Sequence, residues 1–341
     1  MQTAVISGPG QMELKQLPVP EAKPGWIVAR VRAAGVCQTD IEILEGTLPH
    51  LKTGLSKYPM VPGHEWAGEV TAVGESVGGF KPGDRVTGET HVGCGECEAC
   101  RTGFYVACES MLRVGIGGIN GAISEYVTLP AKSVHHLPDE LDFVTAATLE
   151  PATVAYYAIY KCNMKGGENV VVVGPGAIGL LATGIARGLG AGRVTLIGTR
   201  DYRLEIGRKM GAHRTINIRT NPEEVVSLAG TVDVLVDAAG SSDFFSQEIA
   251  MLRKGGVMAM AGFFMGPVPG VDLNTLVTRN LTLVGSLGSP GVWERVMAMV
   301  AGGAFDTKPV ITHRFPLSQA VEAFHAASDR SSGAIKVIIE P

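Results

Sequence analysis

The chain has 341 residues, more than a single hydrophobic core usually supports, so two domains are expected. Its composition, 45% hydrophobic and 18% charged, is that of a globular protein and excludes a disordered chain. The formal net charge is −4 and no basic run occurs, so neither nucleic acid nor a membrane surface is an expected partner. The N-terminus lacks the pattern of a signal peptide and no apolar run reaches membrane-spanning length, so we expect a cytoplasmic protein.

The first part of the chain, to about residue 150, is predicted to be rich in short β-strands. Apolar runs such as residues 27–31 and 68–73 are separated by Pro-Gly pairs at 24–25, 62–63 and 82–83, which mark turns. Past residue 149 the pattern changes to strands alternating with helices of about ten residues, which is typical of a parallel α/β sheet.

The expected elements of this second part follow the alternation closely. We predict strands at 170–173, 193–197, 232–236, 256–260 and 281–284, and helices at 180–189, 202–210, 244–252 and 292–300. A last segment, 316–327 with a strand at 334–339, is expected to rejoin the first domain. The predicted domains are therefore residues 1–152 with 290–341, and residues 153–289.

A glycine-rich turn follows the four valines of the 170–173 strand. The turn Gly174-x-Gly176-x-x-Gly179 leads directly into an apolar helix. The first glycine allows a tight turn, the second lets the backbone approach a pyrophosphate, and the third lets the helix pack on the strand. A diphosphate is stabilised at such a helix N-terminus, so the segment predicts dinucleotide binding.

Four of the six cysteines lie in one short segment with the spacing Cys94-x2-Cys97-x2-Cys100-x7-Cys108. Thiolates are soft ligands that suit tetrahedral Zn²⁺, and four of them close a site without an open position. In a cytoplasmic chain, metal binding is a better interpretation of this spacing than disulfides. We expect a structural zinc site here, and we expect Cys162 to be a buried free thiol.

A second set of candidate ligands is dispersed: Cys37, the pair His64 and Glu65, and Glu150. Three protein ligands with an exchangeable water form the usual arrangement of a catalytic zinc. Each residue also has an ordinary structural interpretation, and Glu150 in particular could cap a helix. Spacing alone leaves both interpretations open.

Together these motifs resemble the zinc-containing medium-chain dehydrogenases, which combine a β-rich GroES-like catalytic domain with a doubly wound, parallel-sheet Rossmann domain. The resemblance covers nearly the whole chain: Gly-Val-Cys-x-Thr-Asp (35–40), Gly-His-Glu-x-x-Gly-Glu-Val (63–70), Lys-Pro-Gly-Asp-Arg-Val (81–86), the cysteine loop, Glu-Pro (150–151) and the glycine turn. Segments 88–94, 202–211 and 311–315 look most like those of the L-threonine and polyol (sorbitol, butanediol) dehydrogenases.

This resemblance implies a role for each residue. Cys37, His64 and either Glu65 or Glu150 would hold a catalytic zinc, Asp40 would hydrogen-bond the second ring nitrogen of His64, and Thr39 would take the proton of the substrate hydroxyl. The metal would lower the pKa of the alcohol, and hydride would pass to the nicotinamide. Further cofactor contacts are implied at Ile178, Ala261, Ser286 and Leu287.

The sequence departs from the family pattern at two places. Where many members have a histidine that relays the proton to solvent, this chain has Glu42, which is either a substitute relay or a solvated helix residue. Where an acidic residue normally binds the ribose of NAD, it has Gly198, followed by Thr199, Arg200 and Arg203. A hydroxyl and guanidinium groups suit a 2′-phosphate, so we expect NADP rather than NAD, although the arginines are also ordinary helix-start residues.

The predicted function is hydride transfer between NAD(P) and a secondary alcohol of a polyhydroxylated or amino-alcohol molecule: a polyol, vicinal diol, sugar, aminocyclitol, aminosugar or L-threonine. The alternatives are a zinc-independent quinone or enoyl reductase and a non-catalytic protein on the same fold. Candidate pocket residues are His50, Trp66, Glu89, His91 and Asn120.

The family resemblance also implies a homodimer or homotetramer. The apolar region 281–300, with Trp293, Met297 and Met299, is either a subunit interface or part of the core.

Overall fold

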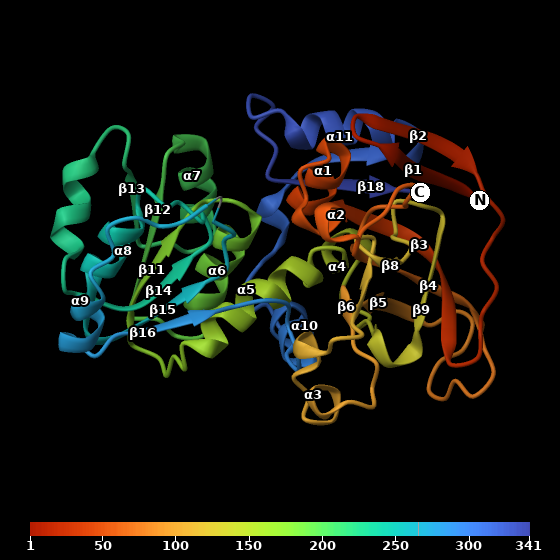
Figure 1. Cartoon of the computed structure of the whole chain (residues 1–341), viewed down its shortest axis with the longest axis horizontal. Coiled ribbons are helices and arrows are strands. Elements are labelled where there is room, and N and C mark those ends of the chain that lie inside the picture. The colour runs from red at the N-terminus through yellow and green to blue at the C-terminus, as the bar shows by residue number, and fades with distance from the viewer. Residues whose placement is uncertain (265) are drawn as a thin grey trace. The chain divides into compact units, whose positions relative to one another are not determined.

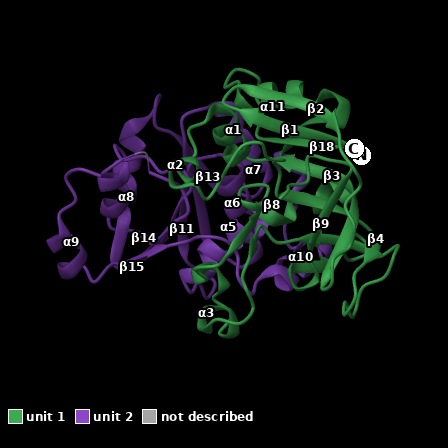
Figure 2. Cartoon of the chain, turned by 45° about the vertical axis from the view of Figure 1, so that its right-hand side comes forward, with its two compact units in different colours: residues 1–150, 311–341 green, residues 151–310 purple. Residues whose placement is uncertain are grey.

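The computed structural model describes every residue except Met265 and divides into two compact units. Unit 1 contains Met1–Glu150 and Ile311–Pro341, and unit 2 contains Pro151–Val310 (Figure 2). The C-terminal segment therefore returns to the first unit, as predicted. Among the described residues, no helix is long and apolar enough to cross a membrane.

Unit 1 is built mainly from antiparallel strands. A seven-stranded sheet has the order β10-β5-β4-β3-β18-β17, with β9 also paired to β3; β1 and β2 form a hairpin and β6, β7 and β8 a small third sheet. The strands are β1 (Gln2–Gly8), β2 (Gln11–Gln16), β3 (Trp26–Val36), β4 (Glu65–Val73), β5 (Arg85–Gly88), β6 (His91–Val92), β7 (Leu112–Val114), β8 (Gly118–Ile119), β9 (Tyr126–Pro130), β10 (Val134–His136), β17 (Ile311–Pro316) and β18 (Lys336–Glu340).

Short helices connect these strands, and α11 lies beside β2 and β18 (Figure 1). They are α1 (Gln38–Glu45), α2 (Pro49–Thr53), α3 (Glu98–Arg101), α4 (Phe143–Ala146) and α11 (Ala320–Ser328), with 3₁₀ turns η1 (Tyr105–Ala107), η2 (Ala131–Ser133) and η5 (Leu317–Gln319). The core contains alternate residues of the long strands, with Trp66 and Phe324 fully buried.

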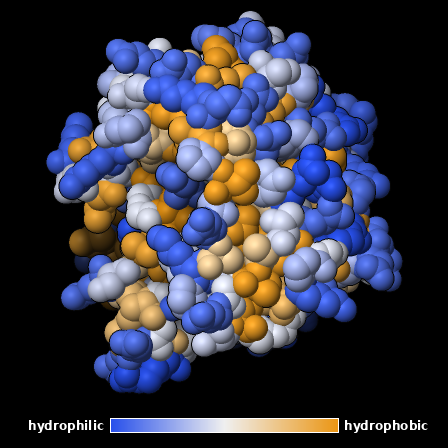
Figure 3. Space-filling view, turned by 90° about the vertical axis from the view of Figure 1, so that its right-hand side faces the viewer, coloured by the Kyte–Doolittle hydropathy of each residue, from blue (hydrophilic) through white to orange (hydrophobic). Residues whose placement is uncertain are grey.

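The surface of unit 1 shows hydrophilic side chains on both sides of a band of apolar atoms (Figure 3). Its exposed large hydrophobic residues include Val19, Leu55, Phe104 and Leu112, which come from three separate segments of the chain. Single exposed hydrophobic side chains are ordinary on globular proteins and do not by themselves indicate a docking surface.

Unit 2 is a six-stranded parallel sheet of order β13-β12-β11-β14-β15-β16, the doubly wound arrangement predicted from the sequence. Val170–Val173 of β11 are buried on both faces, which explains the continuous valine run. The strands are β11 (Asn169–Val173), β12 (Arg193–Gly198), β13 (Arg214–Asn217), β14 (Val232–Asp237), β15 (Leu252–Met260) and β16 (Thr282–Gly285).

The helices of unit 2 lie between these strands along the chain. They are α5 (Leu149–Lys161), which begins in unit 1, α6 (Ala177–Gly188), α7 (Asp201–Lys209), α8 (Phe245–Met251), α9 (Leu273–Thr278) and α10 (Trp293–Ala301), with η3 (Pro222–Leu228) and η4 (Lys308–Val310).

The structure corrects the second predicted domain boundary, because residues 290–310 belong to unit 2. Trp293 and Met297 are buried, and a side chain at Gly184 or Gly188 of α6 would meet Phe305 or Ala304. This packing holds residues 290–310 in unit 2. Trp293 and Met297 are therefore core residues rather than exposed interface residues.

Candidate active site

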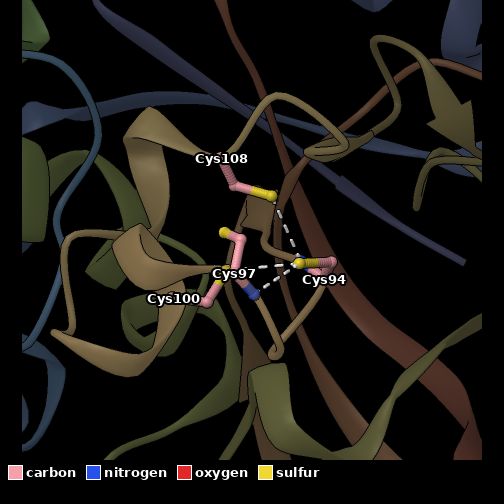
Figure 4. A group of neighbouring side chains, drawn as sticks. All are labelled: Cys94, Cys97, Cys100 and Cys108. Carbon is pink, nitrogen blue, oxygen red and sulfur yellow. Dashed lines mark hydrogen bonds between the residues drawn. The ribbon is translucent and has the colours of Figure 1, made fainter.

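The four cysteines of the 94–108 loop converge, and their sulfur atoms all lie within 4.8 Å of one another (Figure 4). The Sγ atoms of Cys94 and Cys100 are 3.8 Å apart. This is close to the edge of a tetrahedron with zinc–thiolate bonds of about 2.3 Å. The backbone N–H groups of Glu96 and Cys97 donate to Cys94 Sγ and lower the pKa of that thiol to about 6. The loop therefore has the donors and spacing of a closed zinc site.

A second convergence brings together Cys37, His64 and Glu65, whose ligand atoms also lie within 4.8 Å of one another. Cys37 caps α1 directly after β3, and Glu65 begins β4 opposite Gly35 of β3. A Cβ atom at Gly35 would lie 2.3 Å from the Glu65 carboxylate, so glycine is required for this carboxylate to enter the site. A thiol, an imidazole and a carboxylate form a donor set that suits zinc with one position left open.

Asp40 supports this cluster through the backbone. Its carboxylate accepts hydrogen bonds of 2.9 Å from the amides of Cys37 and Gly63, one on each side of the cluster. Asp40 Oδ1 lies 3.8 Å from His64 Nδ1, beyond hydrogen-bond length, so the predicted bond to the ring nitrogen is not made. Burial opposes the charged imidazole, but the charges of Asp40 and Cys37 raise the pKa of His64 well above its usual value.

Lys336 is a member of the site that sequence reasoning missed. Its ammonium group lies 2.6 Å from the Glu65 carboxylate and donates to the Val36 carbonyl at 3.1 Å, entirely within the protein interior. Lys336 and Glu65 are 271 residues apart in sequence, and no local signal links them. Strand β18 brings them together because it pairs with β3.

Glu150 lies close enough to this cluster to interact electrostatically with His64 and Glu65, although it is outside the convergent group of three. The buried Thr90 hydroxyl donates to Glu150 at 2.5 Å. Burial, followed by the charge of His64, has the largest effect on the Glu150 carboxyl, and the net result is a raised pKa. Of the two candidate glutamates, Glu65 has the ligand geometry.

Thr39 and Glu42 both lie on α1, the helix that Cys37 caps. The Thr39 hydroxyl is 3.8 Å from Cys37 Sγ, so it lies beside the group formed by Cys37, His64 and Glu65. Glu42 is half-buried, and burial, with a smaller contribution from Glu45, raises the pKa of its carboxyl. Both residues are therefore on the element that forms one side of the cluster.

In unit 2 the glycine turn has the geometry that the sequence predicted. Gly174 has φ +96°, and a Cβ at Gly179 would lie 1.9 Å from the Gly174 carbonyl oxygen, so only glycine fits either position. Gly176 caps α6 with open space around its α-carbon, as a backbone that approaches a phosphate requires.

The end of β12 explains why no acidic residue follows the turn. A Cβ at Gly198 would lie 2.5 Å from the ring of Pro175, so the proline of the glycine turn excludes any side chain. Arg203 donates to the Tyr202 hydroxyl at 2.9 Å, and Arg200 also hydrogen-bonds it. Burial acts to raise the Tyr202 pKa, but the two arginines outweigh it and lower that pKa. The partly exposed Thr199 completes a cationic strand end with no carboxylate at position 198.

The remaining implied cofactor residues lie at other strand and helix ends of unit 2. Ile178 is in the first turn of α6. Ala261 and Ser286 follow β15 and β16 directly, and their amides donate hydrogen bonds to the carbonyl groups of Asp237 and Met260. The Ser286 hydroxyl is buried and has no hydrogen-bond partner among the described residues, and Leu287 is exposed.

The structure places the five predicted pocket residues in different surroundings. Trp66 is fully buried in the core of unit 1, so it is wrong as a pocket residue, and Asn120 is exposed. Glu89 accepts hydrogen bonds from Tyr105 and His135 and, with His91, lines a cavity of about 130 Å³ beside the cysteine loop. His50 and His91 are partly buried. Cys162 is buried, as expected.

Comparison with known proteins agrees with this geometry. Residues 23–139 match the family described as alcohol dehydrogenase GroES-like domain, and residues 177–302 match the family described as zinc-binding dehydrogenase. An L-threonine 3-dehydrogenase from Deinococcus deserti is 35% identical over 94% of this chain and 93% of its own length. A sorbitol dehydrogenase from Bacillus subtilis is 30% identical over 100% of this chain and 97% of its own.

A solved structure extends the likeness to the whole fold. The putative zinc-binding dehydrogenase from Sinorhizobium meliloti bound to NADP has a TM-score of 0.92 and 28% identity, covering 100% of this chain and 99% of that one. With two clusters of candidate metal ligands and the glycine turn in place, the chain belongs to the zinc-binding alcohol dehydrogenase family and is an NAD(P)-dependent oxidoreductase.

Proposed function

We propose that this chain transfers hydride between NADP and a secondary alcohol of a polyhydroxylated or amino-alcohol small molecule. The observation that carries the proposal is the convergence of Cys37, His64 and Glu65 at the end of α1 that also holds Thr39. We assign these three residues to a catalytic zinc and the four cysteines of the 94–108 loop to a structural zinc. A zinc-independent reductase would have no use for either set.

The chain's own residues prepare the alcohol for oxidation. Bound zinc supplies a Lewis acid that lowers the pKa of the substrate hydroxyl, and the nicotinamide supplies the hydride acceptor. The Thr39 hydroxyl takes the substrate proton, and the half-buried Glu42 passes it to solvent. Asp40 holds the amides of Cys37 and Gly63 and so keeps the two ligand segments in register.

The preference for NADP rests on the end of β12. Arg200, Arg203 and Thr199 offer the guanidinium and hydroxyl donors that suit a 2′-phosphate, and Tyr202 holds the two guanidinium groups together. Pro175 prevents the carboxylate that would bind a ribose hydroxyl from being introduced at position 198. We also propose that the protein is a homodimer or homotetramer.

The decisive assay measures nicotinamide reduction by the zinc-loaded enzyme on L-threonine, 2,3-butanediol, sorbitol, sugars and aminocyclitols, each with NAD and with NADP. Turnover of one of these classes with preference for NADP is the expected result. No turnover on any alcohol or on the matching ketones, with zinc and cofactor bound, would contradict the proposed function.

The cofactor proposal has its own test in the pair Gly198 and Pro175. Gly198→Asp alone should weaken the binding of both NAD and NADP, because the new side chain meets the Pro175 ring. Gly198→Asp combined with Pro175→Ala should shift the NADP/NAD ratio of kcat/KM toward NAD by roughly 10- to 100-fold, since the carboxylate repels the 2′-phosphate. An unchanged ratio in the double variant would exclude this strand end from cofactor selection.

A further inference from the structure

Three basic side chains of unit 1 come together beside the candidate catalytic cluster. His91 of β6 and Arg113 of β7 are direct partners in an antiparallel pair, so their side chains project from the same face. His50 belongs to α2, and hydrogen bonds of Ser56, in the segment after this helix, connect His50 to the residues that follow β7. Ser56 donates its amide to the His50 carbonyl and its hydroxyl to the Ile116 carbonyl.

The guanidinium of Arg113 has little compensation for its charge. Among the described residues it has no carboxylate partner, and it donates one long hydrogen bond, 3.3 Å, to the Met111 carbonyl. Its partial burial lowers the pKa of Arg113. A partly desolvated cation without a counter-ion is unfavourable unless a ligand supplies the opposite charge.

The two histidines add neutral hydrogen-bond donors to this cation. Burial, and then the charge of Arg113, lowers the pKa of His50 and that of His91, the latter to about 4. Both imidazoles are therefore neutral at pH 7, and each has one N–H to donate. The Nδ1 atom of His50 is buried without a hydrogen-bond partner in the described structure, so it is available to a ligand that reaches it.

The three basic side chains lie close to the candidate catalytic cluster. Thr90 precedes His91 in the chain and donates to Glu150, and its carbonyl accepts the amide of Val114, the residue after Arg113. Through Thr90, the strands that carry His91 and Arg113 therefore adjoin the candidate catalytic cluster.

We propose that Arg113, His50 and His91 bind an anionic group, a carboxylate or a phosphate monoester, carried by the substrate. This inference rests on the proposed function and narrows its substrate class. Hydroxy or amino acids and polyol phosphates become the favoured substrates. Neutral polyols and cationic aminocyclitols or aminosugars without an acidic group become poor ones, since a guanidinium repels an ammonium group and gains little from a hydroxyl.

The first test compares substrates that differ in charge: sorbitol with sorbitol 6-phosphate and gluconate, and L-threonine with its alcohol L-threoninol. The anionic member should have the higher kcat/KM, and Arg113→Gln should reduce that advantage by roughly 10- to 100-fold, mostly through KM. Comparison of sorbitol 6-phosphate with gluconate shows whether the site prefers a phosphate or a carboxylate. Arg113→Lys should retain most of the preference, and Arg330→Gln, an exposed arginine of the same unit, should retain all of it.

The second test measures binding and does not require turnover. Calorimetry of malonate and of inorganic phosphate, with the zinc-loaded enzyme saturated with NADP, should show binding in the wild type and in Arg330→Gln, and loss of binding in Arg113→Gln with an unchanged thermal midpoint. If no alcohol is oxidised but this binding pattern appears, the anion site stands and the proposed function fails. Equal binding by Arg113→Gln, or turnover that favours the neutral substrates, overturns the inference.

Discussion

Unit 1 buries Asp40, His64, Glu65, Glu150 and Lys336 around one cluster, whereas unit 2 buries Asp237 and Glu248 with few polar contacts. In unit 1 each carboxylate has a partner: backbone amides for Asp40, Lys336 for Glu65 and Thr90 for Glu150. In unit 2, Asp237 uses one oxygen for the amides of Ala239 and Gly240, while its other oxygen and both oxygens of Glu248 have no partner among the described residues.

The difference shows how burial of charge is to be interpreted. Buried carboxylates that are paired with backbone amides, a lysine and a threonine, beside a histidine and a thiol, form an organised site that suits a metal. Burial, with a smaller effect of Asp237, instead raises the pKa of Glu248 to about 9, so this carboxyl is protonated at neutral pH. The first arrangement indicates function, and the second lowers stability as the pH rises.

Lys336→Met should give the largest loss of stability, because it leaves the Glu65 carboxylate buried without its ion pair. Removing one partner of a buried pair typically costs about 3–5 kcal/mol. Thermal and urea unfolding of the metal-free protein measure the effect. Lys15→Met is the matched control, since its pair with Glu13 is exposed and should cost less than about 1 kcal/mol.

A double variant isolates the role of Glu65 in that loss. Lys336→Met with Glu65→Gln should recover part of the stability that Lys336→Met loses, because no uncompensated charge is left. If Lys336→Met alone proves as mild as Lys15→Met, the buried pair does not stabilise unit 1.

Glu248→Gln should stabilise the protein at neutral pH. The folded pKa of about 9 lies above the value of 4.5 for an unperturbed glutamate, so folded protein retains a proton that unfolded protein loses. The contribution of Glu248 to stability is therefore most favourable below pH 4.5 and becomes less favourable as the pH rises toward 9, by about 3 kcal/mol at pH 7. Thermal midpoints at pH 5 and pH 8 should differ less in Glu248→Gln than in the wild type.

The exposed Glu223 provides the control for this effect. Glu223→Gln should keep the wild-type dependence of the midpoint on pH. A Glu248→Gln protein with that same dependence would show that Glu248 is not the group that titrates.

Thr90→Val should have the smallest effect of the three. It keeps the side-chain shape but removes the hydrogen bond to Glu150, and a bond to a charged group contributes about 1.5–3 kcal/mol. Thr90→Ser retains the hydroxyl and should lie nearer the wild type. Thermal unfolding of the zinc-loaded enzyme compares the two, and equal midpoints would mean that Thr90 does not support Glu150.

The parts predictable from sequence are those in which the cause is local. The cysteine loop and the glycine turn depend on residues a few positions apart, so spacing alone identified them. The valines of β11 indicated a buried parallel strand, whereas β13, with the sequence Arg-Thr-Ile-Asn, was missed because its residues are mostly polar.

The rest depends on how distant strands pair. Lys336 meets Glu65 only because β18 joins β3, and Arg113 meets His91 only because β7 pairs with β6. The ring of Pro175 explains Gly198, which sequence alone identified only as a missing carboxylate. The sequence pattern predicts a domain boundary near position 290, but Ala304 and Phe305 pack on α6.

The central claim is that Cys37, His64 and Glu65 hold the catalytic zinc. Zinc content measured together with turnover in Cys37→Ser tests it most directly. We expect bound zinc to fall from about two ions per chain to about one, with a nearly unchanged thermal midpoint and turnover reduced by roughly 10³-fold or more. Turnover at the wild-type rate, with or without loss of zinc, would show that these three residues do not hold a catalytic zinc.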